Sequence, residues 1–120
     1  MYLAMTEPGS WRAQVRKGWL DLAILAVLWN GRLYGLEILR KLADDSDLVL
    51  AEGTIYPVLN RLRTDGLIDA AWEESGSGHP RKYYQLTPAG RRRAVSMTRE
   101  STDFIKQMQK LLKRIPQEEQ

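Results

Sequence analysis

The chain has 120 residues, enough for one compact domain with its own apolar core and too few for two ordinary domains. Its 43% hydrophobic and 28% charged residues exclude a disordered or fibrous protein, and the lack of cysteine excludes disulfides, thiolate metal sites and cysteine nucleophiles. The formal net charge of +3 is too small to indicate a polyanionic partner unless the basic residues cluster.

The first third of the sequence predicts a loose arm followed by two helices. Residues 1–10 contain Pro, Gly and Ser without apolar periodicity, whereas residues 11–30 carry apolar side chains at helical spacing and end in an Asn-Gly stop signal. The longest apolar run, residues 19–29, is shorter than the roughly 20 residues that cross a bilayer. With no recognisable signal peptide, the cytoplasm is the expected location. A second helix is predicted from Tyr34 to about Asp44.

A third helix is predicted with Pro57 in its first turn, where backbone amides lack intrahelical partners anyway. Its apolar stripe lies on one face, its polar side chains lie on the other, and Asp65-Gly66 ends it. A helix that reads the major groove of DNA needs this division, with forked or short polar side chains facing the bases. The same pattern also fits a surface helix whose arginines are merely solvated. The polar candidates for DNA contact are Thr54, Tyr56, Asn60, Arg61 and Arg63.

A β-hairpin is predicted next, from residues 67–74 and 82–87, because apolar side chains alternate and the connection is long and rich in Gly and Ser. Arg81 and Lys82 stand beside two tyrosines at the base of this loop, a composition that favours phosphate and minor-groove contacts. Alternatively, the charges only keep an edge strand soluble.

The last predicted helix begins at Thr87-Pro88, a cap followed by a favourable first residue, and runs to about residue 115. It is roughly 40 Å long, longer than the small domain that it leaves, so its apolar stripe needs a partner chain. The stripe consists of Met97, Phe104, Met108, Leu111 and Ile115. Residues 91–93, three arginines in its first turn, are expected on a solvated face; a phosphate contact is the alternative.

These elements predict a mainly α fold with a minor β part: a winged helix-turn-helix with a two-stranded wing and a long C-terminal dimerisation helix. The expected divisions are a flexible arm (1–10), a winged-helix domain (11–87), a dimerisation helix (88–116) and a frayed tail (117–120). No nucleophile elbow, P-loop or dinucleotide fingerprint occurs, and the single histidine has no grouped ligands. We therefore expect no enzyme activity, no cofactor and no metal.

Four blocks of sequence stand in a recognisable order and spacing: residues 34–35 (YG), 53–59 (GTIYPVL), 65–68 (DGLI) and 81–90 (RKYYQLTPAG). Together they resemble the PadR family of transcriptional regulators, over about residues 16–115. The single C-terminal helix resembles the family's shorter branch. The resemblance implies a homodimer in which the last helix packs against the first helix and against the partner's last helix.

The resemblance also implies which residues contact DNA: the start and outer face of the third helix and the wing. It adds a phosphate contact by Tyr34. The residues that it marks are Thr54, Tyr56, Asn60, Arg61, Arg81, Lys82 and Tyr83. The expected function is a ligand-responsive bacterial repressor that binds an inverted-repeat operator in double-stranded DNA.

Some members of the short branch bind flat aromatic compounds at the dimer interface. If this chain has such an effector, Trp11 and Trp19 facing Phe104 and Met108 are the expected contacts; packing in the core and the dimer seam is the alternative for the tryptophans. Two rival functions are a winged helix that binds protein partners and a small-molecule-binding dimer without DNA binding. A basic, polar third helix argues against the first rival, and the absence of a catalytic pair argues against an enzymatic form of the second.

Overall fold

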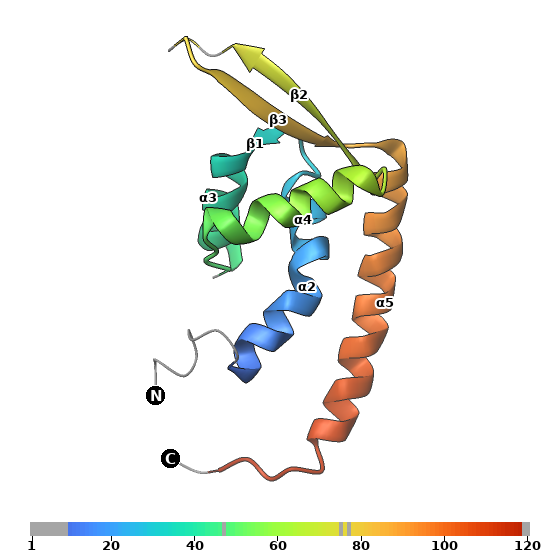
Figure 1. Cartoon of the computed structure of the whole chain (residues 1–120). Helices are drawn as coiled ribbons and strands as arrows, with labels where there is room; N and C mark the ends of the chain where they lie inside the picture. The colour runs from blue at the N-terminus through green and yellow to red at the C-terminus, as the bar shows by residue number, and fades with distance from the viewer. Residues whose placement is uncertain (1–9, 47, 75, 77, 119–120) are drawn as a thin grey trace.

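The computed structural model describes residues 10–46, 48–74, 76 and 78–118, so the predicted arm lies outside the described residues except for Ser10. The elements follow the predicted order of three helices, a hairpin and a long helix (Figure 1). They are α2 (Trp11–Val27), β1 (Leu33–Tyr34), α3 (Gly35–Ser46), α4 (Glu52–Thr64), β2 (Ile68–Glu74), β3 (Pro80–Leu86) and α5 (Pro88–Leu112). The prediction of a mainly α winged helix-turn-helix is confirmed.

The sheet has a strand that the sequence does not predict. Its order is β1-β3-β2, all antiparallel, and the hairpin of β2 and β3 with the loop between them is called the wing below. β1 is only two residues long and pairs Leu33 with Tyr84 and Tyr34 with Tyr83. Tyr34 therefore belongs to this strand and does not open the second helix, which starts at Gly35. Two residues are too few for period-two alternation to be recognised.

The apolar core lies where α2, α3 and α4 meet beneath the sheet. Burying these side chains supplies the main free energy of folding, at roughly 25 cal/mol per Å² of apolar surface removed from water. The side chains that are almost completely buried are Ile24, Leu25, Leu28, Ile38, Leu42, Ile55, Leu59, Leu62 and Ile68. Within the described residues, none of the helices is long and apolar enough to span a membrane.

Helix α4 begins earlier than the sequence predicts. It starts at Glu52 after the N-cap Ala51, so Pro57 stands in the second turn and the prediction that Pro57 lies in the first turn is wrong. Proline lacks the N–H that would bond to the carbonyl of Gly53 four residues back. Gly53 is exposed, so water can satisfy that carbonyl and the helix continues through the proline.

Helix α5 starts as predicted and ends three residues earlier, at Leu112. Thr87 is its N-cap: the Gly90 N–H donates to Thr87 Oγ1 at 2.9 Å, and that hydroxyl donates to the carbonyl of Gly66 at 2.7 Å. Gly90 is buried against the backbone of Leu67. These contacts fix the first turn of α5 on the turn that follows α4, and Figure 1 shows α5 then running alongside α2.

The three arginines at the start of α5 differ in their surroundings. Arg91 is exposed but makes contacts on the surface: its guanidinium lies 4.8 Å from the centroid of the Trp29 ring, and Nη2 donates to the Trp29 carbonyl at 3.2 Å. It thus places a cation just beyond the C-terminal end of α2, where the helix dipole favours positive charge. All three arginines are exposed, as the sequence predicts.

Candidate nucleic-acid interface

Helix α4 presents different side chains on its two flanks. Ile55, Leu59 and Leu62 anchor it in the core. Tyr56 lies on the flank that faces the wing, with 39% of its surface exposed. On the exposed side, Arg63 Nη2 donates to Asn60 Oδ1 at 2.9 Å, and Thr54 is exposed near the start of the helix. The predicted DNA-contact residues of α4 are therefore all accessible, although not all on one side.

Arg61 is held away from the wing. It lies five residues after Tyr56, about 140° further round a helix of 3.6 residues per turn. Its two terminal nitrogens donate to the two carboxylate oxygens of Asp21 on α2, both at 2.8 Å. The hydrogen bond and the charge of Asp21 raise the pKa of Arg61, so the guanidinium stays charged. A contact between Arg61 and DNA remains a prediction, and it requires this ion pair to open.

At the base of the wing, aromatic rings hold several cations in place. Tyr34 and Tyr83 are cross-strand partners, with ring centroids 5.6 Å apart in an edge-to-face arrangement. The guanidinium carbon of Arg81 lies 4.4 Å from the centroid of the Tyr34 ring, and Arg40 Nη2 donates to the Tyr34 hydroxyl at 3.3 Å. Arg32 lies 4.5 Å from the centre of the Tyr83 ring. Such cation–π contacts limit the freedom of long side chains before a ligand arrives.

A hollow of about 510 Å³ separates the wing from the starts of α3 and α4, and it is called the wing-side hollow below. Four of the predicted DNA-contact residues line it, and the other five do not: Thr54, Asn60, Arg61, Arg63 and Tyr83. Its lining consists of Tyr34, Gly35, Leu36, Arg40, Tyr56, Trp72, Arg81, Lys82 and Tyr84. Sequence reasoning missed Arg40 and Trp72. Period-two alternation places Trp72 on the same face of its strand as Ile68 and Ala70, but the wing extends beyond the core and leaves this indole exposed.

Burial raises the pKa of two tyrosines in the wing-side hollow, Tyr56 and Tyr84. A Cβ on Gly35 would come within 2.5 Å of the Tyr56 hydroxyl, so only glycine leaves room for this ring. Burial, and secondarily the charge of Glu52, raises the pKa of Tyr56 above its usual value. Burial likewise raises the pKa of Tyr84. At neutral pH the Tyr56 hydroxyl therefore remains a proton donor, suited to a phosphate oxygen.

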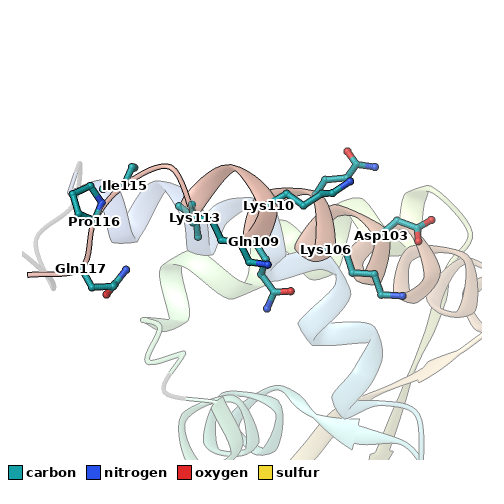
Figure 2. A pocket seen from close by; sticks show the side chains of 10 residues that line it. Asp103, Lys106, Gln109, Lys110, Lys113, Ile115, Pro116 and Gln117 are labelled. Atoms are coloured by element: carbon teal, nitrogen blue, oxygen red, sulfur yellow. The ribbon is translucent and has the colours of Figure 1, made fainter.

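Two other hollows lie along α5. The first, called the α2–α5 groove below, has about 700 Å³ and is lined by Trp19 and Phe104, with Trp11 and Met108 outside its lining. The second, of about 1070 Å³, lies at the C-terminal end of α5, and Figure 2 shows the lysine and glutamine side chains around it. Ile115 lines this second hollow, and no predicted DNA-contact residue does. Among the described residues, no group of three His, Asp or Glu side chains is placed to hold a metal ion.

The fold and the basic, aromatic face beside α4 define a winged-helix DNA-binding protein. The sequence model of the transcriptional regulator PadR-like family matches residues 24–96, so the chain belongs to that family. It is therefore a DNA-binding transcriptional regulator. The prediction made from the four sequence blocks is confirmed.

The chain is also similar to individual proteins, two of which are PadR-family regulators. A PadR family transcriptional regulator from Eggerthella lenta is 31% identical, with a TM-score of 0.75, over 82% of this chain and 86% of that one. A PadR-like transcriptional regulator from Bacillus cereus is 30% identical, with a TM-score of 0.74, over 82% of this chain and 96% of that one. An uncharacterised protein of Lysinibacillus sphaericus is 30% identical over 82 residues, 67% of this chain and 75% of that protein.

Proposed function

We propose that this protein is a homodimeric bacterial repressor that binds an inverted-repeat operator and responds to a small aromatic effector. The observation that carries the proposal is the position of the cation-rich wing beside the exposed face of α4. In a dimer, two α4 helices would enter successive major grooves about 34–36 Å apart, one helical turn. The chromosomal DNA that such a repressor binds lies in the cytoplasm, which is the expected location.

An uncovered apolar face on α5 supports the homodimer. Phe104 has 61% and Leu111 54% of their surfaces exposed, and both lie beyond the part of α5 that packs on the core. Large exposed apolar patches on a small domain mark an interaction surface. A symmetric dimer would cover the same patch on both chains at once. Met97 is half-buried at the upper end of this face, whereas Met108 and Ile115 continue it as exposed side chains.

The α2–α5 groove supports an effector site next to the dimer interface. Trp19 and Phe104 give it apolar walls, and Gln14, Glu100 and Gln107 add polar atoms that could orient a ligand. A pocket with mainly apolar walls and a few polar groups is the usual form of a small-molecule site. A ligand there would act on DNA binding only by its different affinity for two arrangements of the dimer.

The test of the proposed function is a titration of the protein with DNA from upstream of its own gene, at several salt concentrations. Phosphate contacts give a steep decrease of affinity with salt, and base contacts give a preference over random duplex. We expect both, with a preference of at least about 10³-fold at physiological salt. Weak binding without preference would refute the repressor proposal and favour a winged helix that binds protein or small molecules.

Replacing Lys82 with alanine should weaken binding to every duplex by a similar factor. Lys82 lies on β3 in the lining of the wing-side hollow, where it can neutralise one phosphate. We expect the slope of log affinity against log salt to become shallower by about 0.9, the value for one phosphate contact. Arg92→Ala is the matched control, because it removes an exposed cation from α5, at the opposite end of β3 from the wing tip (Figure 1). Equal slopes for the two variants would show that Lys82 contacts no phosphate.

Replacing Asp21 with asparagine should strengthen DNA binding if Arg61 contacts DNA. The carboxylate of Asp21 holds both terminal nitrogens of Arg61, and a phosphate must replace it. An exposed ion pair contributes about 0.2–1 kcal/mol, so we expect Asp21→Asn to raise affinity by about 1.4- to five-fold while the stability falls by less than about 1 kcal/mol. Arg61→Ala should weaken binding. If neither substitution changes the affinity, Arg61 serves only to join α2 to α4.

A further inference from the structure

Trp72 is an exposed tryptophan in the middle of the wing, and 66% of its surface is accessible. Its cross-strand partner on β3 is Lys82, whose ammonium nitrogen lies 5.8 Å from the centre of the indole and 5.9 Å from that of the Tyr84 ring. An indole left in water forgoes about the largest burial energy of any side chain. Within the part of the chain that the structure describes, the indole remains mostly exposed, and its ring contact is with the Lys82 ammonium.

The wing-side hollow is lined by one kind of charge. Arg40, Arg81 and Lys82 contribute three cations, and no Asp or Glu belongs to the lining among the described residues. Tyr56 and Trp72 contribute aromatic surface. The hollow thus offers positive charge to an anion and flat apolar surface to a ring. A single nucleic-acid strand carries both kinds of group, because its phosphates are anions and its sugars and bases are rings.

The position of the wing-side hollow indicates which part of the DNA would occupy it. If α4 lies in a major groove and the wing reaches the neighbouring minor groove, the strand that separates the two grooves must pass between α4 and the wing. The wing-side hollow occupies this position, between Tyr56 on α4 and Trp72 on β2. We propose that the hollow holds one sugar–phosphate strand of the operator and that Trp72 packs against a deoxyribose of that strand. This inference rests on the proposed DNA-binding mode.

Each group then has a distinct task. The cations of Arg40, Arg81 and Lys82 neutralise phosphates, which makes binding salt-dependent. The indole of Trp72 covers an uncharged sugar, so it contributes affinity that depends neither on salt nor on base sequence. It also keeps the ammonium of Lys82 beside the strand through the cation–π contact. Trp72 is therefore a positioning residue for the strand and does not read bases.

The experiment compares wild-type protein with Trp72→Ala and Trp72→Phe on the operator and on a random duplex of equal length, across a range of salt concentrations. We expect Trp72→Ala to weaken binding to both duplexes about ten-fold, from the loss of buried apolar area. Trp72→Phe should recover part of the loss, and the salt slope should change by much less than in Lys82→Ala. Because Trp72 is exposed, both variants should keep the wild-type urea midpoint.

Tryptophan fluorescence gives an independent measurement. DNA should change the emission of the wild type, and most of that change should disappear in Trp72→Phe and persist in Trp29→Phe, because Trp29 does not line the hollow. If the wild type binds DNA and Trp72→Ala binds it with the same affinity, this inference is overturned and the proposed function stands. A loss on the operator alone would also overturn it, because Trp72 would then read bases. Failure of the wild type to bind DNA would overturn the proposed function itself.

Discussion

Replacing Gly90 with alanine is expected to lower the free energy of unfolding by about 2–3 kcal/mol, although alanine is the better helix former by about 1 kcal/mol. A Cβ at this position would lie 1.9 Å from the carbonyl oxygen of Leu67. That carbonyl cannot move freely, because it accepts the N–H of Thr87 at 3.1 Å, and the N–H of Leu67 donates to the carbonyl of Leu62 at 3.0 Å. The first turn of α5 would have to separate from the turn that follows α4.

Urea unfolding measures this effect, and Gly53→Ala is the matched control. A Cβ on Gly53 meets nothing within 4 Å, so alanine there should leave stability unchanged or raise it by up to about 1 kcal/mol. A Gly90→Ala midpoint equal to that of the wild type would show that α5 can shift on α4 at little cost. The result also bears on DNA binding, since the contact at Gly90 fixes the direction of α5 relative to α4.

The features that could be predicted from sequence depend on residues close together in the chain. The start of α5 is one example: a threonine and a proline in succession provide both the cap and the first residue of a helix. The stop at Asp65-Gly66 is another, because Gly66 adopts a positive φ of 78° that other residues rarely adopt. The wing was predicted from alternation along each strand and from the composition of its loop.

The features that were missed depend on residues far apart in the chain. The pairing of Arg61 with Asp21 joins positions 40 residues apart, and periodicity on one helix says nothing about its partner. β1 exists because Leu33 and Tyr34 lie beside β3, and not because of any pattern of its own. For Trp72, the alternation indicated the correct side of the strand, but only the fold shows that the core ends before it.

Replacing Phe104 with glutamate is expected to convert the proposed dimer into folded monomers and to weaken operator binding by about 10²-fold or more. In one chain this side chain is 61% exposed, so a carboxylate there stays hydrated and the protomer keeps its fold. In the proposed dimer the same position is buried, and an unpaired charge in such an interface is strongly unfavourable. Two linked α4 helices bind an inverted repeat about 10²–10⁴-fold more tightly than one, and this advantage is lost with the dimer.

Sedimentation measures the mass, circular dichroism the fold, and a titration with the operator the affinity. Gln109→Glu is the matched control: it adds the same charge to an exposed position five residues further along α5, about 140° round the helix from Phe104. It should leave the dimer intact. A dimer that survives Phe104→Glu would place the contact between chains elsewhere. In that case the α2–α5 groove, which Phe104 lines, would face solvent and not a partner chain. An effector bound in the groove could then not act through the dimer interface.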